Sequence, residues 1–114
     1  MASVKTPRHQ LYRRSSGSKY GNRRIQVDGR TFDSKKEARY YGELKVRQQA
    51  GEVVMFLWQV PFHLPGGTKY IADFVVFLAT GEVEVVDVKG VRTDVYRLKK
   101  RQVEALYPIT IKEV

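Results

Sequence analysis

Two apolar segments separated by three residues place the tightest constraint on how this chain folds. "KYIADFVVFL" (69–78) and "EVEVVDVKG" (82–90) are rich in β-branched and aromatic residues, so both predict strands. The connecting "ATG" predicts a three-residue hairpin loop with Gly81 in the left-handed conformation. In that loop Leu78 faces Glu82, and every other cross-strand pair of the hairpin follows from this register.

Each of these strands carries an acidic residue among apolar neighbours. The predicted register makes Asp73 face Asp87 and Ile71 face Lys89, and valines on both faces of the second strand predict a covered, central strand. Two opposed carboxylates have Cβ atoms about 5 Å apart and repel each other unless a cation lies between them. Oxygen ligands in this arrangement favour Mg²⁺ or Mn²⁺. The alternative is a structural salt bridge in which Lys89 pairs with one of the two acids.

The segments before this hairpin predict a smaller hairpin, a helix and one more strand. Alternating apolar residues on both sides of Asp28-Gly29 predict a two-residue turn. Residues 34–51 predict a helix with Ser34 as its N-terminal cap. Residues 52–64 predict a strand that is broken near Pro61.

The segment after the hairpin predicts a second helix and a short final strand. Residues 93–108 place four apolar side chains at helical spacing, and "ITIKEV" (109–114) is typical of a strand; the four are Val95, Leu98, Val103 and Leu106. The predicted order is hairpin, α, β, β, β, α, β. We therefore expect an α/β fold, of the α+β type with a mixed sheet.

Positive charge is concentrated near the two ends of the chain. The sequence of 114 residues has 21 Lys+Arg, 12 Asp+Glu, no cysteine and a net charge of +9, which favours a polyanionic partner and excludes thiolate metal sites. Residues 1–24 contain basic residues but no acid and predict a flexible basic arm in front of a single domain at 25–114. The candidate phosphate contacts are Arg13, Arg14, Arg23, Arg24, Arg92, Arg97, Lys99, Lys100 and Arg101.

The acidic motifs and their order resemble the PD-(D/E)xK nuclease superfamily, whose restriction-endonuclease-like core has the order α, β, β, β, α, β. "IAD" (71–73) resembles the first half of the motif and "DVK" (87–89) the second, with Ala72 where proline often stands. A closer resemblance, over about residues 19–106, is to small phage-encoded proteins of unknown function. It rests on "RRIQVDGRTFDSKKEARYYGEL", "QVPFHL", "YIADF" and "DVKG".

This resemblance implies a role for each residue of the motif. Asp73 and Asp87 would ligate the metal, with the backbone carbonyl of Val88 as a third protein ligand. Lys89 would orient the attacking water and stabilise charge on the phosphate. Many members of the superfamily also have a glutamate of the first helix at the metal site, and Glu37 matches that position.

Two polar residues each have two interpretations. Glu37 matches the metal-site glutamate, but the spacing of Ser34 and Glu37 also predicts a capping box. Gln59 interrupts an apolar strand, where it either supports the site or bonds within the sheet.

Together these observations predict a Mg²⁺-dependent DNA endonuclease that acts on branched DNA, and the resemblance implies that it is phage-encoded. Similarity to Holliday-junction resolvases implies a homodimer. The apolar segments are too short to span a bilayer, so we expect a soluble protein of the cytoplasm, the host's if it is phage-encoded. The alternatives are a non-catalytic basic nucleic-acid-binding module, and an RNA-directed nuclease or auxiliary nuclease subunit.

Overall fold

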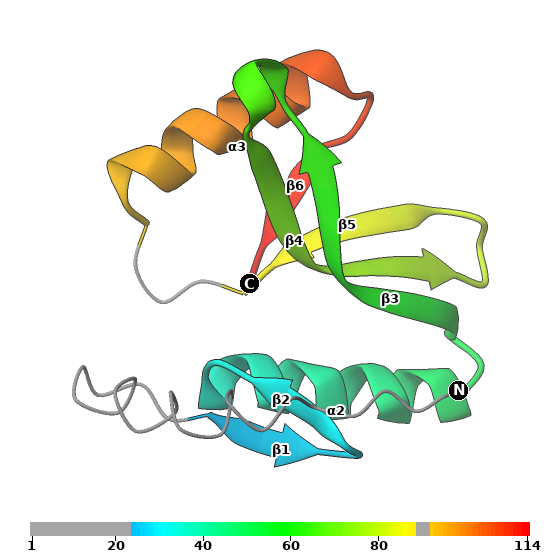
Figure 1. The fold of residues 1–114 in the computed structure, drawn as a ribbon. Coiled ribbons are helices and arrows are strands. Elements are labelled where there is room, and N and C mark those ends of the chain that lie inside the picture. Colours follow the sequence, from blue (N-terminus) through cyan, green and yellow to red (C-terminus); the bar gives the residue numbers. More distant parts are fainter. Residues whose placement is uncertain (1–23, 89–91) are drawn as a thin grey trace. The chain divides into compact units, whose positions relative to one another are not determined.

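The computed structural model describes residues 24–88 and 92–114 (Figure 1). The chain divides into two compact units, Met1–Arg39 and Tyr40–Val114, with the boundary inside a helix. The predicted basic arm, residues 1–24, lies outside the described residues except for Arg24.

The described part of the first unit is a hairpin followed by the start of a helix. Strands β1 (Ile25–Val27) and β2 (Arg30–Phe32) pair antiparallel. The two turn residues between them, Asp28 and Gly29, have φ angles of 54° and 77°, as a tight hairpin turn requires. The predicted Asp28-Gly29 hairpin is therefore confirmed.

Helix α2 (Lys35–Gln49) runs from the first unit into the second and begins directly after the predicted cap, Ser34. Ser34 Oγ accepts the backbone N–H of Glu37 at 3.1 Å, which satisfies one of the unpaired donors of the first turn. At the other end Gly51 has φ 85°, and the N–H groups of Gly51 and Glu52 donate to carbonyl oxygens of the last turn. This pattern is a Schellman motif, which needs a residue that tolerates positive φ.

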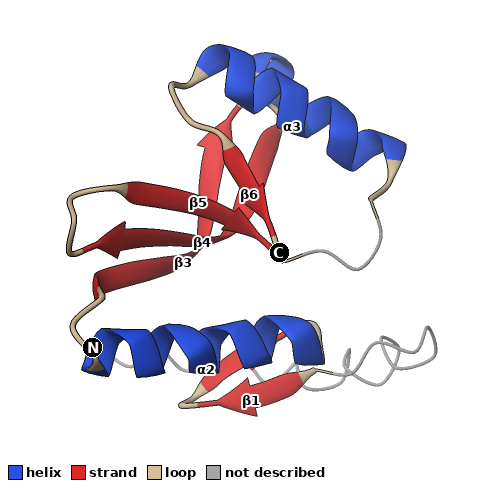
Figure 2. Ribbon diagram, turned by 180° about the vertical axis from the view of Figure 1, so that it is seen from behind, coloured by secondary structure: helices blue, strands red, loops and turns tan. Residues whose placement is uncertain are grey.

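The second unit contains a four-stranded sheet in the order β3-β4-β5-β6, with bounds Val53–His63, Lys69–Leu78, Val83–Asp87 and Ile111–Glu113. A short 3-10 turn, Pro65–Gly67, joins β3 to β4, and helix α3 (Asp94–Leu106) joins β5 to β6. The β3-β4 and β4-β5 pairs are antiparallel and β5-β6 is parallel (Figure 2). The predicted element order and the mixed sheet are confirmed.

The register of the β4-β5 hairpin is the one predicted from its loop. Leu78 N–H donates to the carbonyl of Glu82 at 2.9 Å, and Gly81 has φ 98°. Phe74 pairs with Val86, which continues the same register along the strands. One further step in this register makes Asp73 and Asp87 opposite neighbours.

The two central strands are covered on both faces. On one face the core includes Val75, its partner Val85, and the buried residues of α3, Tyr96 and Val103. On the other, the ring of Tyr40 lies 5.5 Å from that of Phe74, which is fully buried. The prediction of a central, covered position for the strand that carries Asp87 is confirmed.

One prediction about strand detail is wrong. Strand β3 is not broken at Pro61, which pairs with Ile71, because β3 lies at the sheet edge and can spare a backbone donor. The register of β3 against β4 shifts between Val53 and Met55, and Gln59 has φ 61° within a continuous register. Of the four apolar residues spaced along α3 only Val103 is buried, because the helix turns Tyr96 and Val103 inward; the others, Val95, Leu98 and Leu106, are exposed.

Candidate metal and phosphodiester site

Asp73 and Asp87 lie at the point where β5 ends. Asp87 is the last residue of β5 and only 1% exposed, while Asp73 is half-buried in β4. A carboxylate buried this deeply is costly to keep unless donors or a cation compensate the lost hydration. Opposed acids at the end of a central strand are therefore a feature that packing alone does not explain.

Asp73 is tied to the strand that carries Asp87. Its Oδ2 accepts the backbone N–H of Val88 at 2.7 Å, just beyond the last residue of β5. The carboxylate thus replaces a backbone partner for Val88, the residue that follows β5. Lys89 follows immediately and lies outside the described residues.

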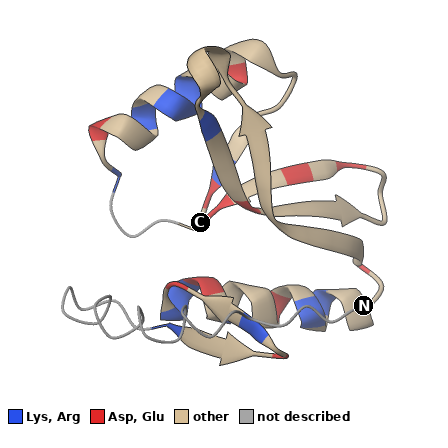
Figure 3. Cartoon of the chain, viewed as in Figure 1, with Lys and Arg blue, Asp and Glu red and all other residues tan. Residues whose placement is uncertain are grey.

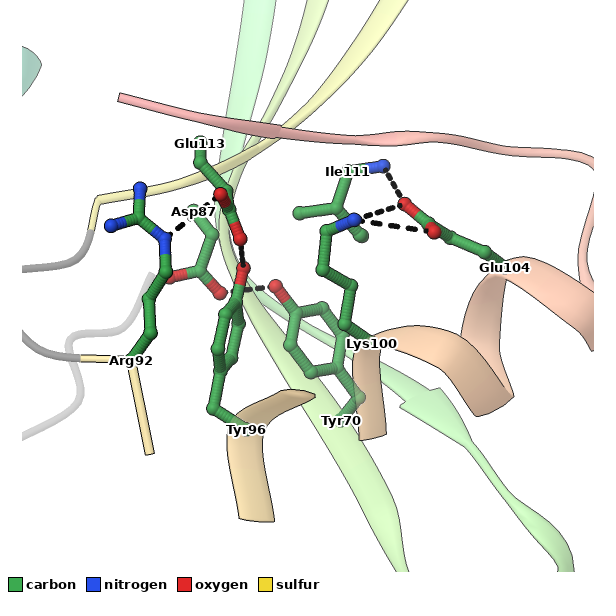
Figure 4. A network of polar contacts seen from close by, with 8 residues as sticks. All are labelled: Tyr70, Asp87, Arg92, Tyr96, Lys100, Glu104, Ile111 and Glu113. Atoms are coloured by element: carbon green, nitrogen blue, oxygen red, sulfur yellow. Dashed lines mark hydrogen bonds and ion pairs between the residues drawn. The ribbon is translucent and has the colours of Figure 1, made fainter. Parts of the chain in front are cut away.

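Asp87 accepts a hydrogen bond from a buried tyrosine. The hydroxyl of Tyr70 donates to Asp87 Oδ2 (Figure 4), and Tyr70 is only 3% exposed. Burial, followed by the bond to the Asp87 carboxylate, raises the pKa of Tyr70 well above its ordinary value. Tyr70 therefore keeps its proton and acts as a donor.

The final strand supports Asp87 from the other side. Asp87 pairs with Glu113 in the parallel β5-β6 register, and Val114 N–H donates to the backbone carbonyl of Asp87 at 3.0 Å. Glu113 in turn accepts the Tyr96 hydroxyl at 2.6 Å and Arg92 Nε at 2.9 Å. Three acidic residues of neighbouring strands thus lie in one row across the sheet, each with its own donor.

The contacts of Glu113 with Tyr96 and Arg92 shift the pKa values of Glu113 and Tyr96. The bond from Tyr96, and then Arg92, lowers the pKa of the Glu113 carboxyl. Burial, and then the bond to Glu113, raises the pKa of Tyr96. At neutral pH Tyr96 is the donor and Glu113 the charged acceptor (Figure 4).

The structure locates the two polar residues that had two interpretations. Glu37 belongs to the first unit, is buried, and has its amide capped by Ser34 Oγ. Gln59 lies between Trp58 and Val60, which pair with Phe74 and Ala72, so its position in β3 is opposite Asp73. Its side chain is exposed.

The basic residues predicted to contact phosphate fall into three groups. Arg13, Arg14 and Arg23 lie outside the described residues, and Arg24 is exposed. Three others have acidic partners within the chain; the pairs are Arg92 with Glu113, Arg97 with Asp94, and Lys100 with Glu104. In the described part of the chain the side chains of Lys99 and Arg101 have no hydrogen bond or ion pair.

The two carboxylates have the chemistry of a magnesium site. Among residues 24–88 and 92–114 no group of three or more His, Cys, Asp or Glu side chains is arranged to hold a metal. Mg²⁺, however, is commonly bound through one or two carboxylates and several waters. A carboxylate has about four acceptor positions, so one hydrogen bond to Oδ2 is compatible with a cation on the same group. Asp73 and Asp87 therefore fit this ion.

Sequence reasoning missed Tyr70, Tyr96 and Glu113. Tyrosine in a strand or on the inner face of a helix has the pattern of a core aromatic, and nothing local marks its hydroxyl as a donor to an acid. The available signal was electrostatic: a buried Asp87 needs a donor, and tyrosine is one of the few residues that supply one from within a core. Glu113 could be assigned to the site only once the parallel pairing of β5 and β6 was known.

The fold and site define a small α+β domain with paired acids at the end of its central strands. The chain belongs to the family described as "Protein of unknown function (DUF1064)", whose model matches residues 17–112. No curated protein and no solved structure matches the chain. None of the helices in the described ranges is long and apolar enough to cross a membrane.

Proposed function

We propose that this chain is a metal-dependent DNA endonuclease with a restriction-endonuclease-like core. The observation that carries the proposal is the opposition of Asp73 and Asp87 on β4 and β5, with Lys89 two residues after Asp87. The element order α, β, β, β, α, β from α2 to β6 supports it, because that order is shared with the superfamily the motifs resemble.

Each residue of the motif has a distinct task in this reaction. Asp73, Asp87 and the carbonyl of Val88 would hold Mg²⁺ or Mn²⁺, and the ion would supply a water nucleophile at neutral pH and charge neutralisation at the phosphate. Lys89, two residues after Asp87 in the sequence, would orient that water and stabilise the phosphate oxygens. Glu37 is either a further carboxylate of the metal site or a residue of the helix cap alone.

The proposed substrate is branched DNA, such as a four-way junction, bound by a homodimer. Lys and Arg residues recur along α3 (Figure 3), and phosphate contacts from such residues fix position without reading sequence. The helices and strands of residues 24–88 and 92–114 include no separate module for the major groove. We therefore propose that the chain recognises the shape of branched DNA and not its base sequence.

A cleavage assay tests the proposal. A labelled four-way junction and the matching linear duplex are incubated with Mg²⁺, Mn²⁺ or chelator and three proteins: wild type, Asp73→Asn and Glu82→Gln. Asp73→Asn keeps an oxygen for the Val88 amide but removes the charge. Glu82→Gln removes one charge from an exposed residue of the same hairpin.

We expect metal-dependent cutting of the junction by wild type and Glu82→Gln, and none by Asp73→Asn. Glu37→Gln and Lys89→Gln, assayed in the same way, show whether these two residues are needed for cleavage. Cutting by Asp73→Asn at the wild-type rate would overturn the nuclease proposal. Salt-sensitive DNA binding without cutting under any condition would instead support a non-catalytic binding module, in which the Tyr70 and Val88 bonds are the whole purpose of the two acids.

A further inference from the structure

Arg92 is held beside the row of acids at the end of the sheet. It lies between β5, which ends at Asp87, and α3, which begins at Asp94. Its Nε donates to Oε1 of Glu113 at 2.9 Å, and Glu113 is the β6 residue that pairs with Asp87. The guanidinium is therefore fixed to the strand next to Asp87, at the same end of the sheet as the candidate metal site.

Glu113, which binds Arg92, is itself held in place from the core. Its Oε2 accepts the Tyr96 hydroxyl at 2.6 Å, while its Oε1 accepts Arg92 (Figure 4). Tyr96 belongs to the buried core cluster and is only 7% exposed. Both oxygens of the carboxylate thus have a donor, and the contacts from Tyr96 through Glu113 restrict the orientations that the Arg92 side chain can adopt.

The bond to Glu113 uses only one of the five N–H donors of the Arg92 guanidinium. Within residues 24–88 and 92–114, its Nη1 and Nη2 atoms have no hydrogen bond or ion pair, and the side chain is 42% exposed. Figure 4 shows these two nitrogens on the side of the guanidinium that is turned away from Glu113. The four remaining donors form a planar fork, which matches two oxygens of a phosphate.

Orientation, more than charge, is what this arginine can add to binding. Glu113 already neutralises Arg92, and the chain has a net charge of +9 without help from this pair. An arginine that is held in its binding orientation loses less side-chain entropy when it meets a ligand. A fork prepared in this way beside two candidate metal ligands fits a phosphate of the DNA backbone.

We propose that Arg92 binds a backbone phosphate of DNA at the Asp73–Asp87 site through its two terminal nitrogens, and that Glu113 and Tyr96 are positioning residues that orient it. This inference rests on the proposed function for the location of the DNA, but not on cleavage. It gives a task to Glu113 and Tyr96, which belong to neither half of the acidic motif.

DNA binding without divalent metal tests the role of the guanidinium. The Kd of a labelled four-way junction and of the matching duplex is measured for the full chain as wild type, Arg92→Lys and Arg47→Lys. Arg47→Lys is the matched control, because Arg47 Nε also donates to a glutamate, Glu52, at 3.1 Å. Glu52 precedes β3 at the end of the sheet where Val53 pairs with Leu78, away from the acids.

Lysine keeps the positive charge of Arg92 but cannot donate two parallel N–H groups to a phosphate. We expect Arg92→Lys to raise the Kd of the junction about tenfold, the usual effect of losing a hydrogen bond to a charged group. Arg47→Lys should bind like wild type. Wild-type affinity in Arg92→Lys would overturn the inference, because charge alone would then account for the binding.

Glu113→Leu separates positioning from charge, because the two effects have opposite signs. Removing an acid beside the DNA should by charge alone strengthen the binding of a polyanion. If Glu113 orients Arg92, its loss should instead raise the Kd several-fold, and this increase should be absent when Glu113→Leu is added to Arg92→Lys. Tighter binding by folded Glu113→Leu would overturn the positioning role.

Tyr96→Phe tests the same role if Glu113→Leu does not fold. It keeps every charge and removes only the hydroxyl that holds Glu113. We expect a higher Kd for the junction in this variant, whereas a purely structural hydrogen bond predicts wild-type affinity in the folded protein. Wild-type affinity in Tyr96→Phe would therefore overturn the positioning role.

Cleavage of the junction with Mg²⁺, measured on the same proteins, separates this inference from the proposed function. Weaker binding by Arg92→Lys, with no cleavage by wild type, would reject the nuclease and keep the inference. Cleavage by wild type, with wild-type binding by Arg92→Lys, would keep the nuclease and overturn the inference. Failure of wild type to bind either DNA would reject both.

Discussion

At the scale of single residues, the chain stabilises three acids at one end of its sheet with three different donors. Val88 supplies a backbone amide to Asp73, Tyr70 a hydroxyl to Asp87, and Tyr96 a hydroxyl to Glu113. Removing one such donor leaves an acceptor without its partner, which costs about 1–3 kcal/mol when the acceptor is buried. These bonds stabilise the acids without a cation, so the acids have a structural role whether or not they bind a metal.

Tyr96→Phe should make the free energy of unfolding depend less on pH between pH 3 and pH 7. The bond from Tyr96 contributes most to lowering the pKa of Glu113 below its ordinary value of 4.5. A lowered carboxyl pKa stabilises the fold fully above pH 4.5, and this contribution is lost as the pH falls through the folded-state pKa. The Glu113 side chain is 26% exposed, so we expect a loss of about 1 kcal/mol at pH 7.

Urea unfolding of wild type and Tyr96→Phe between pH 3 and pH 7 measures this effect. The difference in unfolding free energy between the two proteins should be largest at pH 7 and shrink below pH 4.5. Tyr107→Phe provides the control, because its hydroxyl bonds to a carbonyl that does not titrate in this range. A difference of the same size at pH 3 and pH 7 would show that the bond from Tyr96 does not lower the pKa of Glu113.

At the scale of elements, two glycines of the same helix region should respond in opposite directions to alanine. Gly51 has φ 85° in the motif that ends α2, whereas Gly42 lies inside the helix, and an added Cβ meets no atom within 4 Å at either position. Backbone conformation therefore decides the outcome. Gly42→Ala should stabilise by about 0.5–1 kcal/mol and Gly51→Ala should destabilise by about 1 kcal/mol, measured from urea midpoints. Destabilisation by both would show that space, not φ, governs these sites.

Strand β3 stores strain opposite Asp73. Gln59 has φ 61°, a region that costs a residue with a Cβ about 1–2 kcal/mol and that glycine adopts freely. Gln59→Gly should raise the free energy of unfolding by up to about 1 kcal/mol, and Gln59→Val should lower it by about 1–2 kcal/mol. Leu57→Gly, at an ordinary position of the same strand, should lower it by about 0.5–1 kcal/mol. Thermal and urea unfolding of the three variants test these signs, and stabilisation by valine would refute the strain.

The elements that could be predicted from sequence are those with local signals. The turn at Asp28-Gly29, the ends of α2 and the β4-β5 register each depend on residues close in the chain, and each is confirmed. The inner face of α3 could not be predicted in the same way. A helix over a small sheet buries a narrow stripe, and which apolar residues it contains depends on how the helix is rotated.

The candidate site could be predicted only in part, for the same physical reason. Opposition of Asp73 and Asp87 follows from a three-residue loop, which is local. The donors come from positions distant in sequence: Tyr70 lies 17 residues from Asp87, and Tyr96 lies 17 residues from Glu113. Such pairs require the packing of α3 and β6 on the sheet, which no short motif encodes.

At the scale of the whole molecule, a net charge of +9 should make any nucleic-acid binding strongly dependent on salt. The residues of α3 differ in how much they can contribute. Lys100 is bound to Glu104 at 3.1 Å, whereas the side chain of Arg101 has no ion pair in the described part of the chain. A cation that is already neutralised within the protein releases fewer counterions when it meets a phosphate.

Binding of a labelled four-way junction at several salt concentrations, without divalent metal, should therefore separate these two residues. Arg101→Ala should reduce the slope of log Kd against log salt by about 1, the effect of one lost phosphate contact. Lys100→Ala removes a cation of the same charge one residue away and should reduce the slope by less, because Glu104 already neutralises it. Equal reductions would show that the Lys100–Glu104 pair opens on DNA, and no reduction for Arg101→Ala would place the DNA away from α3.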